Sequence, residues 1–560
     1  MNAETAGLAV AASHPLAEPD GAPLLVMRGL VIETSGPGRP QRIVDGIDLE
    51  LQAGEVLGLI GESGAGKSTI GLAALGYVRP GCRFAGGSVL FDGQDLLALP
   101  PEGCRALRGT RIAYVAQSAT ASFNPAHRLI DQVVETATRQ AGMGRRQAEQ
   151  DARELFARLA LPDPDHIGQR FPHELSGGQL QRVMIAMAMI CRPDLIVFDE
   201  PTTALDVTTQ VEILASIRNV VEAFGTAAIY ITHDLAVVTQ LAHRITVLRH
   251  GRIVEEAPTR AMLAAPRESY TRSLWAVRQI RKMPEPNHGA PLLELDGISA
   301  SYGSVPVLRD VSLTVGTGGT VALVGESGSG KSTLARVVAG LLPPTAGQVL
   351  LQGRRLPKAL RDRSRDQLRR VQLIHQSPDA ALNPRQSIRE AIGRPLQLSG
   401  GLRGAARESR LHELMALVEL KPELLDRLPG ALSGGQKQRV CIARALAAGP
   451  ELLICDEVTS ALDQVVQAGI LAMLQRLQKE LGLSCLFITH DIATVRAIAD
   501  EVVVMRQGAV VESGARDKVL ETPSNDYTRL LLSCVPDVDP DWLTRLLQQR
   551  ADTRDINDAG

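Results

Sequence analysis

Short runs of apolar residues, each followed by glycine-rich, acidic or histidine-containing sequence, dominate the hydrophobic pattern of the chain. Uninterrupted runs of this kind are typical of buried parallel strands. They occur at residues 56–60, 195–198, 228–231, 321–324, 452–455 and 485–488. Helix-forming sequence follows the first and fourth runs, at 68–78 and 332–342. Because such strands alternate with helices, the pattern predicts an α/β fold.

Two longer segments have a different pattern. Polar helix formers and leucine dominate between roughly residues 130 and 172, and again between roughly 385 and 430. This composition predicts a helical subdomain inserted into each of two α/β cores.

The chain contains an internal repeat. Four segments recur in the same order: Gly61–Thr69 as Gly325–Thr333, Leu175–Gln179 as Leu432–Gln436, Ile231–Asp234 as Ile488–Asp491, and Tyr270–Arg272 as Tyr527–Arg529. The offset is 264 residues at Lys67 and Lys331 and 257 residues at the three later segments, a difference typical of loop-length variation. Two tandem domains of the same organisation are therefore predicted.

The expected domain boundaries follow from this repeat. We expect a mobile tail at 1–23, a first repeat at 24–280, a linker at 281–291, a second repeat at 292–535 and a C-terminal tail at 536–560. Three prolines and a glycine exclude a helix in the linker. No basic residue precedes the mildly apolar stretch of the N-terminal tail, so a signal peptide is not expected.

Each repeat contains the pattern GxxxxGK[ST] between a predicted strand and a predicted helix, which is the context of a phosphate-binding P-loop. Glycines let backbone N–H groups curve around phosphate oxygens, and the helix N-terminus adds a positive partial charge. We expect Lys67 and Lys331 to reach the β- and γ-phosphates of ATP, and Ser68 and Ser332 to place a hydroxyl on Mg²⁺. The predicted nucleotide-binding residues of the two loops are Gly61, Glu62, Ser63, Gly64, Ala65, Gly66, Lys67, Ser68 and Thr69, and Gly325, Glu326, Ser327, Gly328, Ser329, Gly330, Lys331, Ser332 and Thr333.

An Asp-Glu pair follows an apolar strand in each repeat, at Asp199-Glu200 and Asp456-Glu457. A carboxylate at a strand end beside a P-loop is well placed to support Mg²⁺, and the next carboxylate could polarise the attacking water. An isolated pair of this kind often only caps a helix. The P-loop in the same repeat favours the catalytic interpretation.

A histidine follows a strand and a threonine in each repeat. A single histidine is more often structural than catalytic. His233 and His490 lie 33 residues after Glu200 and Glu457, respectively, and this recurrence favours a catalytic role for both histidines.

Composition narrows the functional classes. The 60 basic and 62 acidic residues give a net charge of -2, without the positive excess that nucleic-acid backbones attract, and aromatic residues make up only 3%. No uninterrupted apolar run reaches the roughly 18 to 20 residues that span a bilayer. The seven cysteines form no CxxC pair, which is typical of a reducing cytosol.

The most specific sequence is Leu-Ser-Gly-Gly-Gln followed by Gln-Arg, whose serine lies 23 residues before the strand-end aspartate in both repeats. Together with the P-loops and acidic pairs, it resembles the ATP-binding-cassette (ABC) family from about Leu24 to Leu532. The resemblance implies two tandem P-loop NTPase domains that pair head to tail, with each ATP between the P-loop of one repeat and the signature of the other. The signature residues are Ser176, Gly177, Gly178 and Gln179, and Ser433, Gly434, Gly435 and Gln436. At a helix start they would offer a hydroxyl and N–H groups to a γ-phosphate.

The same resemblance assigns further positions. Gln117 and Gln376 match the Q-loop, which senses Mg²⁺ and the membrane partner, and Asp206 and Asp463 match the D-loop. The implied metal-site residues are Ser68, Gln117 and Asp199, and Ser332, Gln376 and Asp456. The sequence at 398–402 mimics the signature without its final Gln and is expected to be a loop.

Within the family, the chain resembles ATPases of peptide and nickel importers. Each Q-loop is followed by a stretch ending in Asn-Pro, and each repeat continues into Tyr-Thr-Arg, similar to that subfamily's C-terminal extension. Tyr302 matches the aromatic residue that stacks on adenine, whereas Thr34 occupies that position in the first repeat, which predicts weaker nucleotide binding there. Only Cys534 lies near the cysteine cluster of many subfamily members, so no iron–sulfur cluster is expected.

These features predict an energy-coupling subunit of an ABC importer that hydrolyses ATP with Mg²⁺ at the cytoplasmic face of the inner membrane. Two transmembrane permease subunits and an extracytoplasmic solute-binding protein are the expected partners, without nucleic acid. Peptide, nickel, glutathione and an opine-like compound all remain open as cargo. The alternative is a soluble tandem ABC ATPase acting on ribosomes or DNA. The short linker and the absence of zinc-binding Cys pairs weigh against that alternative.

Overall fold

The computed structural model describes residues 21–36, 40–203, 205–277, 280–283, 289–460 and 462–558. Most of the expected N-terminal tail at 1–23 and part of the linker at 281–291 lie outside these residues. The chain divides into two units. The first contains the described residues up to Thr203, Thr209–Arg272 and those from Pro536 onward, and the second contains 205–208 and Ser273–Val535.

Each unit is built on a six-stranded sheet, in which the apolar runs form the buried central strands. The strands of the first sheet are β3 (Val56–Gly61), β6 (Ile112–Val115), β7 (Leu195–Asp199), β8 (Ala227–Ile231), β9 (Arg244–Arg249) and β10 (Arg252–Pro258). Those of the second are β13 (Thr320–Val324), β16 (Val371–Ile374), β17 (Leu452–Asp456), β18 (Ser484–Ile488), β19 (Glu501–Arg506) and β20 (Ala509–Ala515). The strand orders, β10-β9-β3-β8-β7-β6 and β20-β19-β13-β18-β17-β16, are equivalent. Only β10 and β20, at the edges, are antiparallel to their neighbours, so the carboxyl ends of the other strands meet at one edge of each sheet.

A second, antiparallel sheet of four strands completes each core. Its strands are β1 (Leu25–Thr34), β2 (Arg42–Leu51), β4 (Cys82–Phe91) and β5 (Gln94–Asp95) in the first unit, and β11 (Pro291–Tyr302), β12 (Val305–Gly316), β14 (Ala346–Leu351) and β15 (Arg354–Arg355) in the second. In the first unit, Leu30 of this sheet and Leu57 of the six-stranded sheet belong to one hydrophobic cluster, which also contains Ile70 from the helix after the P-loop. The predicted α/β core is confirmed.

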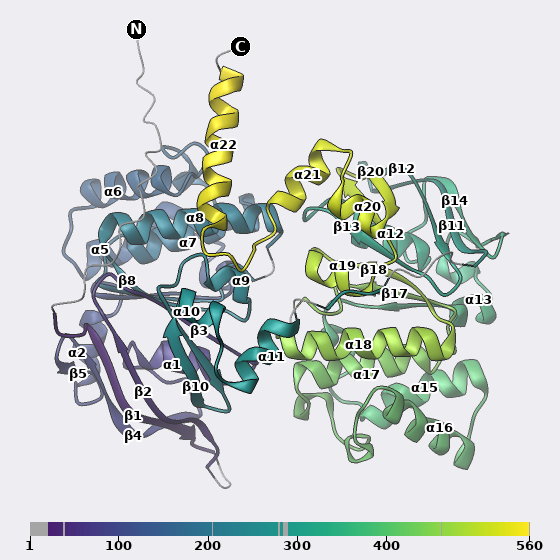
Figure 1. The fold of residues 1–560 in the computed structure, drawn as a ribbon, viewed down its shortest axis with the longest axis horizontal. Coiled ribbons are helices and arrows are strands. Elements are labelled where there is room, and N and C mark those ends of the chain that lie inside the picture. The colour runs from purple at the N-terminus through teal and green to yellow at the C-terminus, as the bar shows by residue number, and fades with distance from the viewer. Residues whose placement is uncertain are drawn as a thin grey trace. The chain divides into compact units, whose positions relative to one another are not determined.

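Helices cover these sheets and form the predicted subdomains. The helices before the second repeat are α1 (Lys67–Ala73), α2 (Pro101–Leu107), α3 (Ala119–Ser122), α4 (Leu129–Val133), α5 (Glu135–Arg139), α6 (Arg145–Arg158), α7 (Gly177–Met189), α8 (Val207–Phe224), α9 (Leu235–Val238), α10 (Thr259–Ala264) and α11 (Ser269–Val277). Those that follow are α12 (Lys331–Val338), α13 (Arg365–Arg370), α14 (Pro378–Ala381), α15 (Ile388–Gly400), α16 (Gly404–Leu417), α17 (Gly434–Leu446), α18 (Gln464–Leu481), α19 (Ile492–Ile498), α20 (Arg516–Glu521), α21 (Asp526–Ser533) and α22 (Trp542–Asp558). Short 3₁₀ turns occupy Ile167–Gln169, Pro172–Glu174, Leu360–Asp362, Pro422–Leu424 and Pro429–Ala431. Figure 1 shows α15, α16 and α17 grouped on the side of the second unit away from β11, β12 and β14.

Some expected boundaries were wrong. The helices expected at 68–78 and 332–342 end at Ala73 and Val338, because Gly76 and Gly340 take left-handed backbone angles, with φ of 62° and 80°. The segment 398–402, expected to be a loop, begins within the last turn of α15. Gly401, with φ of 63°, ends that helix.

The C-terminal segment expected to be a tail instead contains the helix α22, which belongs to the first unit (Figure 1). The side-chain amide of Gln240 donates to the backbone carbonyls of Asp537 and Asp539, at 2.7 and 3.0 Å, and its oxygen accepts from the backbone N–H of Leu543 at 3.1 Å. Leu543 is fully buried. The sequence of α22 did not predict this docking, because the helix is mostly polar and has few apolar side chains to bury. Among the described residues, no helix combines the length and hydropathy of a membrane span.

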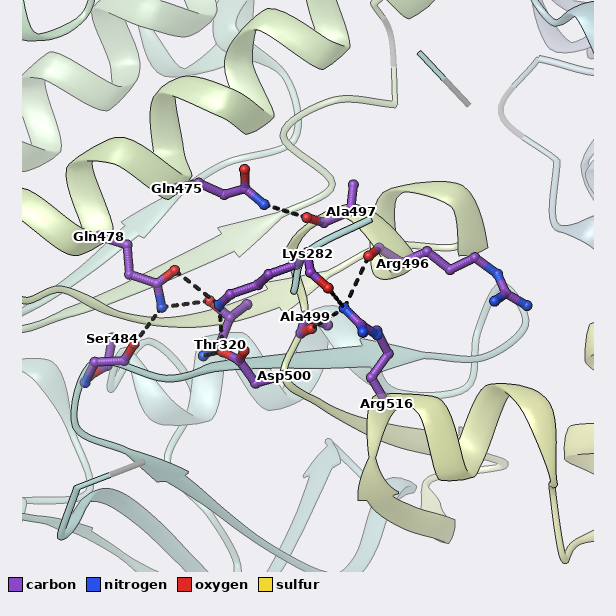
Figure 2. Close-up of polar contacts among 11 residues, drawn as sticks. Lys282, Thr320, Gln475, Gln478, Ser484, Arg496, Ala497, Ala499, Asp500 and Arg516 are labelled. Carbon is purple, nitrogen blue, oxygen red and sulfur yellow. Dashed lines mark hydrogen bonds and ion pairs between the residues drawn. The ribbon is translucent and has the colours of Figure 1, made fainter. Parts of the chain in front are cut away.

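The expected linker at 281–291 contains a buried anchor. The ammonium of Lys282 lies 2.7 Å from the carboxylate of Asp500, and the two side chains are only 8% and 5% exposed. Asp500 also accepts from the backbone N–H of Thr320, and the carbonyl of Lys282 accepts from the guanidinium of Arg516 (Figure 2). Lys282 is therefore part of the second unit rather than an exposed spacer.

Candidate functional site

The P-loop of each repeat connects a central strand to the helix that follows it, β3 to α1 and β13 to α12. Its first glycine packs against the neighbouring strand. A Cβ added to Gly61 would lie 2.2 Å from the carbonyl oxygen of Leu248, and one added to Gly325 would lie 2.2 Å from that of Met505. Both glycines have positive φ, 152° and 148°. Any larger residue would displace the loop from the strand end.

The P-loop lysines point into their own loops. The ammonium of Lys67 donates to the carbonyl oxygens of Gly61 and Glu62, at 2.7 and 2.9 Å. Lys331 does the same with Gly325 and Glu326, at 2.9 and 2.7 Å. Burial lowers the pKa of Lys331.

A hydroxyl and a carboxylate meet beside each loop. Ser68 donates to Oδ1 of Asp199 at 2.8 Å, and Ser332 donates to Oδ1 of Asp456 at 2.9 Å. Oxygen donors of this kind suit Mg²⁺. Burial raises the pKa of Asp456 above its usual value. The predicted metal-site serine and aspartate are therefore in contact within each repeat.

The second acid of each pair is held by the predicted Q-loop glutamine and histidine. Gln117 donates to Oε2 of Glu200 at 3.1 Å, and Nδ1 of His233 lies 3.3 Å from Oε1. The second repeat has the same arrangement, with Gln376 at 2.6 Å and His490 at 3.4 Å from Glu457. Both glutamates have φ of 50°, a left-handed conformation uncommon for a residue with a side chain.

The glutamate and the histidine of each pair shift one another's pKa. Burial opposes ionisation of Glu200, but the hydrogen bond and charge of His233 outweigh it, so the pKa of Glu200 is lowered. Burial also disfavours the imidazolium of His233, but Glu200 raises its pKa. The pKa values of Glu457 and His490 shift in the same directions for the same reasons. A charged glutamate is the form that can polarise a water molecule.

Tyr114 belongs to this site in the first repeat and was missed from the sequence. Its hydroxyl donates to Oδ2 of Asp199 at 2.6 Å, while Ser68 occupies Oδ1. The equivalent residue in the second repeat is Leu373, since β6 and β16 pair in the same register with β7 and β17. Tyr114 lies within a short apolar strand and carried no signal of its own.

The signature serines begin helices. Ser176 starts α7 with a reciprocal cap: its hydroxyl accepts from the N–H of Gln179 at 3.3 Å, and the Gln179 side chain accepts from the N–H of Ser176 at 3.1 Å. Ser433 and Gln436 form the same cap on α17. The side chain of the signature Gln therefore caps the start of its own helix.

The second signature glycine is required by packing. A Cβ at Gly178 would lie 2.2 Å from Cγ2 of Thr209, and one at Gly435 would lie 2.5 Å from Cγ1 of Val466. These neighbours belong to α8 and α18. Each glycine therefore lets the following long helix approach the signature helix closely.

The adenine-stacking position differs between the repeats. Tyr302, at the end of β11, is 42% exposed, and its hydroxyl accepts from Arg336 at 2.8 Å. Thr34 ends β1, and its hydroxyl accepts from the backbone N–H of Gln41. In the second repeat, a cavity of about 290 Å³ adjoins the P-loop and is lined in part by Lys331, Glu457 and His490.

Comparison with known proteins decides the family. A family model described as "ABC transporter" matches residues 44–203 and 308–460.

The chain belongs to the ABC transporter family.

A second family model, "Oligopeptide/dipeptide transporter, C-terminal region", matches residues 511–560 of this ABC protein. The relatives that align over nearly the whole chain include two YejF proteins and a GsiA protein. An uncharacterised ABC transporter ATP-binding protein, YejF of Escherichia coli, is 37% identical over 91% of this chain and 99% of its own length. The glutathione import ATP-binding protein GsiA of Pectobacterium atrosepticum is 37% identical over 92% and 90%, and the peptidoglycan transport ATP-binding protein YejF of Agrobacterium fabrum is 36% identical over 91% and 96%. The chain is therefore an ATPase with two ABC domains, one in each repeat.

Proposed function

We propose that this ABC ATPase powers the import of a di- or oligopeptide, or a related small solute such as glutathione, at the cytoplasmic face of the inner membrane. The observation that carries the proposal is the tandem match, over about nine-tenths of the chain, to ATP-binding proteins named for glutathione import and peptidoglycan transport. The C-terminal match to the oligopeptide and dipeptide transporter region supports it. A role on ribosomes or DNA has no comparable support.

The site residues have separate proposed roles. Lys67 and Lys331 bind the β- and γ-phosphates, and Glu200 and Glu457 polarise the attacking water while His233 and His490 hold these carboxylates. Mg²⁺ fits the hydroxyl–carboxylate pairs, which are hard oxygen donors. The ion would be held by Ser68, Gln117 and Asp199 in the first repeat and by Ser332, Gln376 and Asp456 in the second. When bound, it would neutralise charge on the phosphates.

Head-to-tail pairing of the repeats on ATP is part of this proposal. Each signature serine, Ser176 or Ser433, would then complete the opposite nucleotide site through the N-terminus of its helix. Cysteine pairs replacing Ser433 and Ser63, or Ser176 and Ser327, should crosslink with a non-hydrolysable ATP analogue. The absence of either crosslink in the presence of the analogue would contradict the pairing.

The partners and cargo can be tested together. Two transmembrane permease subunits and an extracytoplasmic solute-binding protein are proposed, without nucleic acid. Affinity capture of the tagged chain from solubilised membranes should recover the permeases, and the solute-binding protein encoded with them should bind a peptide or glutathione in calorimetry. Co-sedimentation with ribosomes or DNA in place of permeases would overturn the proposal.

The two nucleotide sites are expected to differ in affinity. Lys331→Ala leaves the first P-loop intact, and Lys67→Ala leaves the second, which has the stacking ring of Tyr302. One base–aromatic stack contributes about 1–3 kcal/mol, so the Lys331→Ala protein should bind ATP about 5- to 150-fold more weakly than the Lys67→Ala protein. Equal dissociation constants, measured with a fluorescent ATP analogue, would refute this difference.

We also expect the protein to carry no iron–sulfur cluster, because Cys534 is the only cysteine in the C-terminal extension of the second repeat. Protein purified anaerobically should be colourless and free of iron. A brown chromophore with bound iron would contradict this expectation.

A further inference from the structure

The recurring Tyr-Thr-Arg segments contact the P-loops. The hydroxyl of Tyr270, in α11, accepts a hydrogen bond from the backbone N–H of Glu62 at 3.2 Å. The hydroxyl of Tyr527, in α21, accepts one from the backbone N–H of Glu326, also at 3.2 Å. The contact occurs in both repeats at the same P-loop position, so it is a duplicated feature.

The residue that each tyrosine binds is also bound by the P-loop lysine. Lys67 donates to the carbonyl oxygen of Glu62 at 2.9 Å, and Lys331 donates to that of Glu326 at 2.7 Å. The tyrosine hydroxyl and the lysine ammonium therefore hold the N–H and the C=O of one residue. A shift of this residue would move the carbonyl that positions the ammonium.

The tyrosine rings are themselves fixed. Tyr270 and Tyr527 are only 7% and 5% exposed. The guanidinium of Arg249 lies 4.7 Å from the ring centre of Tyr270, and that of Arg506 lies 4.7 Å from the ring centre of Tyr527. These arginines end β9 and β19, the strands beside the P-loop strands.

The C-terminal extension of each repeat is the segment that contains its Tyr-Thr-Arg sequence. A glutamate on the edge strand anchors the start of each extension. Glu255 of β10 accepts from the backbone N–H groups of Arg267 and Glu268, at 2.9 and 3.1 Å. Glu512 of β20 accepts from Ser524 and Asn525, at 2.7 and 3.3 Å. Each extension is therefore attached to the sheet edge by a carboxylate and to the P-loop by a tyrosine.

We propose that Tyr270 and Tyr527 are positioning residues through which the C-terminal extension of each repeat sets the geometry of its P-loop and lysine. The inference rests on the proposed role of these loops in nucleotide binding. It assigns the Tyr-Thr-Arg segment a part in nucleotide affinity in addition to packing.

Tyrosine-to-phenylalanine variants test the hydroxyl alone. Tyr270→Phe is made in the Lys331→Ala protein and Tyr527→Phe in the Lys67→Ala protein, so that each measurement reports one P-loop. Because the loop N–H loses its acceptor, the dissociation constant of a fluorescent ATP analogue should rise by about 2- to 12-fold in each variant. In the otherwise unchanged protein, Tyr527→Phe should raise the KM for ATP and leave kcat within about twofold.

Two further variants separate positioning from packing. Tyr77 also carries an arginine over its ring, Arg108 at 5.6 Å, but is 39% exposed, and Tyr77→Phe should leave nucleotide affinity unchanged. Tyr527→Leu removes the ring as well and should lower both affinity and thermal stability. The inference would be overturned by two results together. The phenylalanine variants would bind nucleotide as tightly as the Lys331→Ala and Lys67→Ala reference proteins, and the leucine variant would lose thermal stability but not nucleotide affinity.

The two proposals fail differently. Reference proteins that bind no nucleotide would contradict the assignment of the P-loops and the inference with it. Reference proteins that bind normally, with phenylalanine variants that match them, would contradict the inference alone.

Discussion

Replacing Glu457 with glutamine is expected to lower the ATPase rate by about 10²- to 10⁴-fold while ATP stays bound, because glutamine keeps the shape of the side chain but cannot accept a proton from water. The contacts support this role: Gln376 and His490 both hold the Glu457 carboxylate, and His490 keeps its pKa low. Glu200→Gln should have the same effect if both sites must turn over. Phosphate release gives the rate, and nucleotide retained through gel filtration gives the trapped state.

Glu423→Gln is the matched control, since Glu423 is exposed on a short 3₁₀ turn of the same repeat. Its rate should equal that of the unchanged protein. If Glu457→Gln turned over at that rate as well, Glu457 would not be the general base. A slow Glu457→Gln variant with a nearly normal Glu200→Gln variant would show that the sites are unequal, as Thr34 suggests.

Replacing Lys282 with methionine should destabilise the second unit by about 3–5 kcal/mol, because it leaves the buried carboxylate of Asp500 without its partner. The neighbouring Arg281 is 66% exposed, and Arg281→Met should change stability by less than about 0.5 kcal/mol. Both effects can be read from urea unfolding, with hydrogen exchange at β13 and β19 as the local probe.

A second substitution checks the cause. Asp500→Asn added to Lys282→Met removes the unpaired charge and should recover much of the lost stability, since the amide oxygen can still accept from the N–H of Thr320. A double variant no more stable than Lys282→Met would show that the loss comes from packing of the lysine stem.

The sequence predicted which side chains meet beside each P-loop because these residues come from short contiguous segments. A P-loop, a strand-end Asp-Glu pair and a strand-end histidine can each be recognised from a short stretch of sequence. Because the strands that end in them are parallel, the three motifs lie at the same edge of the sheet. Within each repeat the structure does bring together Lys67, Ser68, Asp199, Glu200 and His233 or their equivalents. Because each motif occurs twice in the chain, the alternative that it serves only a structural purpose was easier to reject.

What could not be predicted depends on contacts between segments far apart in sequence. Tyr114 and Asp199 are separated by 85 residues, and Tyr270 and Glu62 by 208. Lys282 and Asp500 are separated by 218 residues, and the proline-rich surroundings of Lys282 suggested only a spacer. A buried ion pair has no local sequence pattern, because neither of its two charged residues differs in sequence from an exposed one.

The placement of α22 has a consequence for how this polypeptide can be divided. A gene interrupted at the join between the repeats would encode a first product that lacks the segment containing Leu543, the buried residue whose N–H donates to Gln240. It would encode a second product that contains α22 but lacks the surface of the first unit on which α22 packs. Fusion in a single polypeptide therefore does more than fix a one-to-one ratio of the halves. It supplies one half with structure that only the other half's coding region contains.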